Sequence, residues 1–157
     1  MEEGAPRRGV TPQAIAAQVC EALNRSQAKY LVIGGIACIL HGYMRATTDV
    51  DILIERTLTN AERVLEALAT IGYGFAREWA AAEILKRPIT VIGDDPAVDV
   101  FTVAWKVKYE QAVKRSSVVE LDTVSVSSTI RSSRKRSPRV GSGRVRVSPR
   151  VTTQCPA

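Results

Sequence analysis

The sequence has little that would support a soft-metal site or passage through a membrane. It contains one histidine and three cysteines, Cys20, Cys38 and Cys155, without C-x-x-C spacing, which argues against a zinc site. The longest apolar run, Tyr30 to Leu40, includes two glycines and is about half the length that a membrane-spanning helix needs. The first ten residues are charged and lack the apolar segment of a secretory signal. We therefore expect a cytoplasmic protein with no membrane partner.

Acidic residues are missing from the C-terminal part of the chain. Residues 123 to 157 contain eight Lys and Arg and no Asp or Glu, whereas residues 1 to 122 contain all 16 acids and 14 basic residues. The net charge is thus +8 in the last part and −2 in the rest. Residues 128 to 157 are rich in Ser, Arg, Val, Pro and Gly and lack Leu, so we expect a disordered basic tail. Such a tail binds polyanions without sequence preference or is simply solvated.

The remaining residues have the size and composition of one folded domain. The chain has 157 residues, of which 45% are hydrophobic and 24% charged. These values predict a soluble domain over residues 11 to 127 behind a flexible leader of residues 1 to 10. The expected helices cover residues 12 to about 25, 36 to 40, 61 to 71, 78 to 86 and 105 to 115, and the expected strands cover residues 29 to 33, 47 to 54, 89 to 92, 97 to 103, 118 to 121 and 124 to 126.

Two local details follow from these patterns. Thr59 to Glu62 reads as a capping box at the start of the third helix. Trp79, Phe101 and Trp105 are expected in the core, because they are not clustered in the basic setting of a base-stacking surface.

Two glycines stand where the first strand passes into a helix. Gly34 and Gly35 lack a Cβ, so a ligand is able to approach the backbone closely there. Free N–H groups at a helix start also favour an anion. A tight turn that binds nothing would need the same residues, so the pair alone is weak evidence of a phosphate site.

Three acids interrupt apolar strand patterns. Asp49 and Asp51 are two residues apart and are expected on one face of their strand, with Val50 and Ile52 toward the core. Asp99 lies between Val98 and Val100, where an acid needs a cation or a donor. Carboxylates in this arrangement are typical ligands of Mg²⁺.

The segment GGIACILHGYMRATTDVDILIE together with Asp99 resembles the polymerase-beta-type nucleotidyltransferase superfamily. Within it, the wording is similar to small prokaryotic nucleotidyltransferases related to abortive-infection toxins and to toxin-antitoxin pairs. The resemblance covers about residues 30 to 126. It implies an α/β (α+β) fold, with a mixed-sheet nucleotidyltransferase core flanked by helices.

The resemblance also implies roles for individual residues. Gly34 and Gly35 would contact the triphosphate of an NTP, while Asp49, Asp51 and Asp99 would bind two Mg²⁺ ions, with Asp99 helping to activate an acceptor hydroxyl on RNA or protein. Arg45 and Thr48 resemble polar nucleotide-binding positions before the acid pair. For Arg45, capping the turn is an equal alternative. For His41, the one histidine, a packing or capping role is favoured over catalysis.

Other functions were weighed on the same residues. Haloacid dehalogenase phosphatases place Asp-x-Asp after an apolar strand, whereas here the apolar residues follow the pair, and neither G-x-G-x-x-G nor the P-loop motif occurs. The chain departs from the family after Val126, where related chains continue with a leucine-rich segment and a charged helix. A change of reading frame would explain the departure. The alternative function is therefore an inactive nucleotide- or nucleic-acid-binding module, or an antitoxin-like partner.

Overall fold

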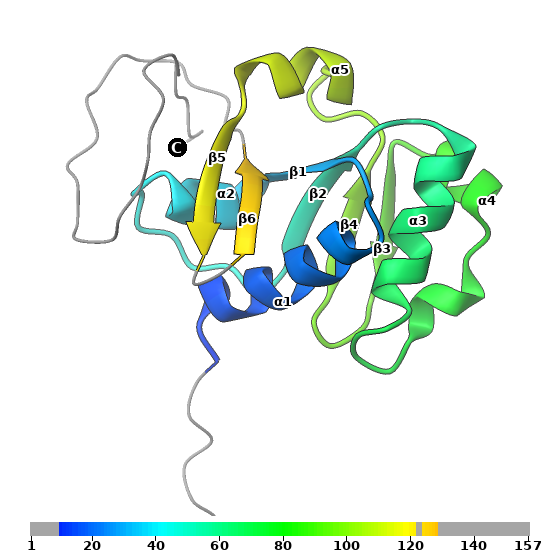
Figure 1. The fold of residues 1–157 in the computed structure, drawn as a ribbon, viewed down its shortest axis with the longest axis horizontal. Helices are drawn as coiled ribbons and strands as arrows, with labels where there is room; N and C mark the ends of the chain where they lie inside the picture. Colours follow the sequence, from blue (N-terminus) through cyan, green and yellow to red (C-terminus); the bar gives the residue numbers. More distant parts are fainter. Residues whose placement is uncertain (1–9, 122–123, 129–157) are drawn as a thin grey trace, which may run out of the picture.

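The computed structural model describes residues 10–121 and 124–128. Its strands form one mixed sheet in the order β3-β4-β2-β1-β6-β5 (Figure 1). The strands are β1 Tyr30–Ile33, β2 Val50–Ile54, β3 Ile89–Ile92, β4 Val98–Phe101, β5 Ser117–Leu121 and β6 Val124–Ser128. The helices are α1 Pro12–Arg25, α2 Gly34–Leu40, α3 Leu58–Leu68, α4 Ala81–Leu85 and α5 Tyr109–Ala112, with short 3-10 turns η1 Phe75–Glu78 and η2 Val113–Arg115.

One face of the sheet is covered by helices. In Figure 1, α1 and α3 lie in front of the strands, and both pack together over the main core. The stripe predicted for α1 is confirmed, because Val19 and Leu23 are fully buried and Ile15 packs against them from the rim. Val32 and Ile52 meet the helices from the sheet. Burial of these apolar side chains is the main contribution to the stability of the fold.

The opposite face of the sheet is covered over only part of its area. A smaller cluster of Leu31, Ile33 and Leu53 packs there against Ala104 and Ala112, which lie on the segment between β4 and β5. Side chains alternate along each strand, so Asp51 and Asp99 belong to this second face. Farther out on β3, Ile89 and Val91 are exposed. The second face thus combines a small apolar cluster with an open acidic area.

The predicted mixed α/β architecture is confirmed by these elements and by the sheet topology. Both predicted hairpins are present, since β3 pairs with β4 and β5 with β6, each in antiparallel register. Among the helices of the described ranges, none has the length and apolar character needed to cross a bilayer. The leader and the basic tail lie outside the described residues, except for residues 10 and 128.

The second strand is shorter than predicted. We expected it from Thr47, but β2 begins at Val50. Its neighbour β1 ends at Ile33, where the chain turns into α2, and the last pair between these strands is Ile33 with Asp51. Residues 47 to 49 therefore have no partner from β1. Asp49 consequently lies in the loop before the strand.

The capping box predicted for α3 is wrong, because the N-cap lies two residues before Thr59. Thr57 is the N-cap, and its Oγ1 accepts a hydrogen bond from the N–H of Asn60 at 3.3 Å. The helix starts at Leu58 and ends at Leu68 rather than Ile71. Thr57 takes the cap because its backbone is extended, as an N-cap requires, while Thr59 is already inside the first helical turn.

The prediction of one helix from Trp105 to Arg115 is also wrong. Ala104 and Val107 exchange two backbone hydrogen bonds of 3.0 and 2.8 Å and close a tight turn. Helix follows only at α5 and η2. The side chain expected in the core at Trp105 is 53% exposed, because the residue stands at the tip of this turn. Phe101 and Trp79 are partly buried, and the guanidinium of Arg87 lies over the Trp79 ring at 5.3 Å.

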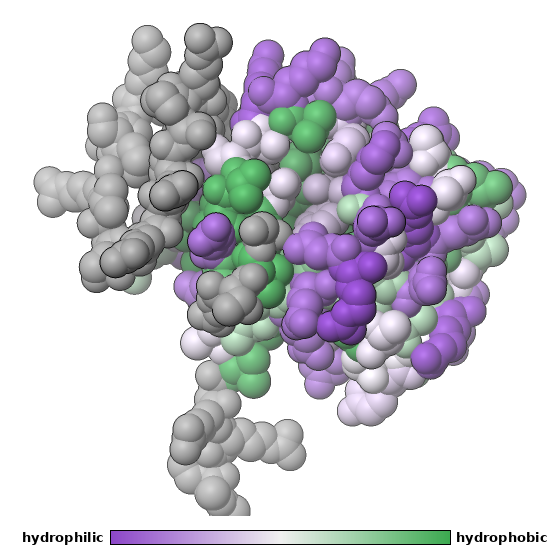
Figure 2. All heavy atoms as spheres, in the orientation of Figure 1, coloured by the Kyte–Doolittle hydropathy of each residue, from purple (hydrophilic) through white to green (hydrophobic). Residues whose placement is uncertain are grey.

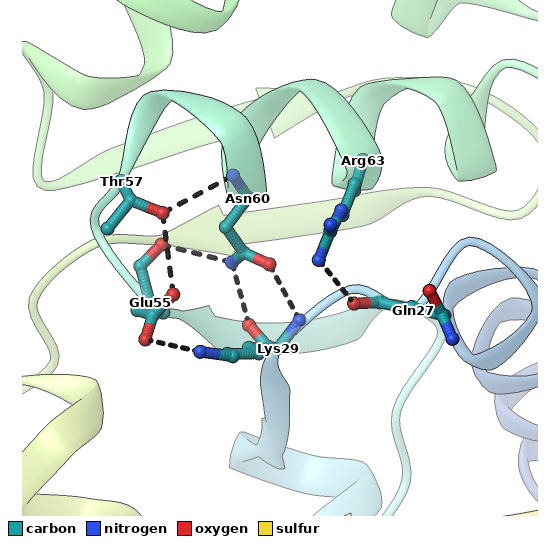
Figure 3. A network of polar contacts seen from close by, with 6 residues as sticks. All are labelled: Gln27, Lys29, Glu55, Thr57, Asn60 and Arg63. Atoms are coloured by element: carbon teal, nitrogen blue, oxygen red, sulfur yellow. Dashed lines mark hydrogen bonds and ion pairs between the residues drawn. The ribbon is translucent and has the colours of Figure 1, made fainter.

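A polar network ties the start of α3 to the ends of β1 and β2 (Figure 3). The buried Asn60 accepts a bond from the N–H of Lys29 at 2.7 Å and donates to the C=O groups of Lys29 and Glu55 at 2.9 and 3.0 Å. One side chain thereby pairs three backbone groups from two strands. The helix is fixed against the sheet at that point, which places β2 and its acids relative to β1.

We expect Asn60→Ala to lower the free energy of unfolding by about 2 kcal/mol, because the Lys29 N–H loses its partner and the C=O groups of Lys29 and Glu55 each lose one of two hydrogen bonds. Urea unfolding followed by circular dichroism measures the change. The matched control is Arg63→Ala, which removes one exposed 3.4 Å bond to Gln27 and should cost no more than about 0.5 kcal/mol. Equal unfolding midpoints for Asn60→Ala and the wild type would contradict this role.

Candidate functional site

Two of the three predicted acids lie side by side on neighbouring strands. β2 and β4 are parallel, and Asp51 stands directly opposite Asp99 in their register. Their strand neighbours Val50, Val98 and Val100 point to the helix-covered core. Both carboxylates are therefore on the face that α1 and α3 do not cover, and both residues are half-buried. Strands next to each other are about 4.8 Å apart, so the two acids are near neighbours.

The glycine turn closes around one of these acids. The N–H of Gly35 donates a hydrogen bond to the Asp51 carboxylate. Gly34 has a positive φ of 66°, and a Cβ at that position would overlap the Asp51 carboxylate. A Cβ on Gly35 would come within 2.8 Å of the Thr47 side chain. The turn thus needs both glycines to accommodate its own neighbours, independently of any ligand.

The third acid lies at the edge of this pair and is exposed. Asp49 accepts a hydrogen bond from the Thr48 hydroxyl at 2.8 Å, and its backbone C=O accepts one from the Thr47 hydroxyl at 3.2 Å. Thr47 also touches the Gly35 position, so it connects the acid loop to the glycine turn. Sequence reasoning missed Thr47. The signal available was the Thr-Thr pair directly before Asp49.

The acids influence one another through their charges. Burial and the charges of Asp99 and Asp49 raise the pKa of Asp51 to about 6, although Arg45 and the Gly35 N–H partly oppose the shift. Burial and the charge of Asp49 also raise the pKa of Asp99. When carboxylates lie this close together, the negative charge of one disfavours ionisation of the other, and a bound cation removes this effect. The site is therefore suited to attract a positive group.

Arg45 lies near the acids, whereas His41 and the turn residue Asp94 have other surroundings. Arg45 is exposed, and its charge acts on Asp51, which places it near the acids. His41 ends α2 and is partly buried, and this burial lowers its pKa. That position agrees with the packing or capping role expected for His41. Asp94 is engaged elsewhere, since its carboxylate accepts bonds from the N–H groups of Tyr73 and Phe75 at 2.7 and 2.8 Å.

The carboxylates of the site are suitable ligands for a divalent cation. Carboxylate oxygens are the ligands that Mg²⁺ prefers, and Mg²⁺ commonly keeps several waters beside one or two carboxylates. Asp51 and Asp99 supply such a pair. Within the described ranges, no three His, Cys, Asp or Glu side chains are arranged closely enough to hold a metal by themselves. Asp49, the third predicted ligand, is exposed in the loop before β2.

Comparison with models of protein families, with curated proteins and with solved structures gives no match to this chain. The relation to nucleotidyltransferases therefore stays a resemblance in sequence pattern. The roles of the site residues stay predictions that the geometry supports to different degrees.

Two glycines with left-handed backbones allow a controlled test of the turn. Gly34→Ala and Gly42→Ala both place a Cβ at positive φ, which costs roughly 1–2 kcal/mol in each case. The Gly42 Cβ would meet no described atom within 4 Å, whereas the Gly34 Cβ would overlap Asp51. We expect Gly34→Ala to destabilise the protein clearly more in urea unfolding, and Gly34→Ala with Asp51→Ala to recover part of the difference. Equal losses at both glycines would contradict the close approach.

The raised pKa of Asp51 predicts a pH dependence of stability. The folded protein holds this proton more tightly than the unfolded chain does, so the stabilisation is complete below pH 4 and is lost as the pH rises through about 6. Asp51→Asn should flatten the decline between pH 4 and 6. Carboxyl ¹³C NMR titration gives the pKa directly, and chemical denaturation at several pH values gives the stability. A wild-type pKa near 4 would rule out the proposed crowding of charges.

Proposed function

We propose that this chain is a Mg²⁺-dependent nucleotidyltransferase that moves a nucleoside monophosphate from an NTP to an acceptor hydroxyl. The observation that carries the proposal is the register of β2 and β4, which puts Asp51 opposite Asp99 on an open sheet face beside the Gly34-Gly35 turn. Two acids far apart in the sequence and a glycine turn thus meet at one edge of the fold. The resemblance to the polymerase-beta-type superfamily names the same residues.

The cation would be held by Asp51 and Asp99, joined by Asp49 when a second ion is bound. Mg²⁺ supplies charge neutralisation for the triphosphate and lowers the pKa of the attacking hydroxyl. Arg45 would attract the phosphates from the exposed loop, and Thr48 would hold Asp49 in place through their 2.8 Å bond. These residues position charge and leave the transfer itself to the reacting groups.

The glycine turn has to release one contact before it receives phosphate. At present the Gly35 N–H donates to Asp51. A phosphate oxygen would take that N–H, and the Asp51 carboxylate would then be free to face the cation. The exchange replaces one charge-assisted hydrogen bond by another, so its free-energy cost is small.

Asp99 would receive the proton of the acceptor hydroxyl. In the transfer, the acceptor oxygen forms a bond to the α-phosphorus, the bond from that phosphorus to pyrophosphate breaks, and the hydroxyl proton passes to the Asp99 carboxylate. Asp99 would act as the base from its place beside Asp51 on the same face of the sheet. RNA and protein hydroxyls are both candidates for the acceptor, and a toxin-antitoxin or phage-defence setting in the cytoplasm, with an antitoxin or toxin as partner protein, agrees with the resemblance.

The test is label transfer from each α-labelled NTP with Mg²⁺, using RNA and cell-extract proteins as acceptors. We expect Asp51→Asn and Asp99→Asn to reduce transfer by a factor of about 100 or more, because they remove the proposed ligand and base. Asp95→Asn is the matched control, since Asp95 is an exposed acid of the β3–β4 turn and should leave transfer unchanged. Equal transfer in wild type and both site variants would overturn the mechanism.

Binding separates this proposal from the inactive alternative. Mg²⁺-dependent NTP binding without transfer to any acceptor would favour a nucleotide-binding module or an antitoxin-like protein. The departure of the chain from the family pattern after Val126 is the observation that favours this alternative. Polyanion binding that is lost when residues 128 to 157 are deleted would have a different cause, namely the charge of the tail.

A further inference from the structure

The segment between β4 and β5 lies on the same face of the sheet as the acids. Its apolar residues Ala104, Val107, Tyr109 and Ala112 pack against the cluster formed by Leu31, Ile33, Leu53 and Phe101. Asp51 and Asp99 occupy the neighbouring positions of the same strands and the same face. The segment therefore borders the candidate site, at the end of β4 that follows Asp99.

The outer side of this segment is basic. Lys106, Lys108, Lys114 and Arg115 are all exposed, and Glu110 is the single acid between residues 104 and 115. The net charge of these residues is therefore +3. Figure 2 shows hydrophilic residues gathered over α5 at the top of the molecule. The rest of residues 1 to 122 carries more acids than bases, so the positive charge is local.

An exposed tryptophan stands at the start of this basic segment. Trp105 is 53% exposed and has φ of 48°, and Lys106 beside it has φ of 66°. A left-handed backbone is unfavourable for side chains of this size. Tight turns with two successive left-handed residues usually contain Asn and Gly at these positions. Strain of this kind is concentrated at functional sites. The Trp105 ring is thereby exposed, and the next residue in the chain is the exposed cation Lys106.

We propose that residues 105 to 115 bind a single-stranded polynucleotide, with a base stacked on Trp105 and phosphates on the four cations. This inference rests on the proposed function, in which the acceptor would then be the terminal hydroxyl of that strand. Ala104 follows Asp99 by five residues, so the two positions are at most roughly 18 Å apart. A few nucleotides would span this separation and bring the terminal hydroxyl to Asp51 and Asp99.

Other polyanions fit this surface less well. A membrane surface would need a continuous row of exposed apolar residues, whereas Val107, Tyr109 and Ala112 face the sheet. The exposed apolar side chains of the segment are Trp105 and Val113, which are eight residues apart. An acidic peptide would use the cations but has no group that requires an exposed, strained tryptophan. A single strand uses both, because every base has a face that stacks on an aromatic ring and every nucleotide brings a phosphate.

The test measures binding of labelled 12-nucleotide single-stranded RNA and DNA, the corresponding duplexes and anionic vesicles to the full chain. We expect Trp105→Ala to weaken single-strand binding about tenfold and Trp105→Phe to restore most of it. Replacing Lys106, Lys108, Lys114 and Arg115 by Gln should reduce the slope of log K against log salt by about 3. Tyr73→Ala and Lys86→Gln, an exposed aromatic and an exposed cation elsewhere, should change neither quantity.

Several results would overturn the proposal. One is equal affinity of wild type and Trp105→Ala, and another is preferential binding to duplexes or vesicles. A third is complete loss of binding when Arg131, Arg134, Lys135 and Arg136 are replaced by Gln, because the tail would then account for the affinity. Asp51→Asn should keep single-strand binding while losing transfer. Binding that depends on Trp105 in a chain without any transfer activity would contradict the proposed function and leave the polynucleotide surface supported.

Discussion

The structure depends on the confinement of one carboxylate. Asp51 lies between Asp99 on β4 and the Gly34-Gly35 turn, and the space around it is so limited that a methyl group on Gly34 would overlap it. The Gly35 N–H gives the carboxylate one hydrogen bond, which offsets part of the repulsion from Asp99 and Asp49. Burial, followed by the repulsion from Asp99 and Asp49, raises the pKa of Asp51 in spite of this bond. A cation or a phosphate would each change this balance.

The confined carboxylate also explains why the two glycines suit both a structural role and a binding role. As a structural device, they let a strand turn directly into a helix against a neighbouring acid. As a binding device, they would expose backbone N–H groups to phosphate once that acid turns away. The same geometry supports both readings, because a carboxylate and a phosphate are both anions that accept from a helix start. In this molecule Asp51 occupies that place.

The two faces of the sheet divide stability and chemistry between them. The face beneath α1 and α3 is filled with apolar side chains and fully buries Val50 and Ile52 on either side of Asp51. The other face leaves Asp51 and Asp99 open, next to a basic segment whose apolar side anchors it to Leu31 and Leu53. Opposite charges therefore lie on one surface without pairing: the described ion pairs are Arg25–Glu21, Lys29–Glu55 and Lys86–Glu83.

The sequence by itself determined most of the buried positions, the type of most elements and the candidate acids, because the period of apolar residues reports the side of a helix or strand that leaves water. It failed where a partner element decides the outcome. β2 starts at Val50 because β1 ends, and Thr57 rather than Thr59 caps α3 because its backbone is extended. Only the tertiary structure put Asp51 opposite Asp99 and turned Trp105 outward, since strand register and a tight turn arise from contacts between distant or non-periodic residues that no local pattern encodes.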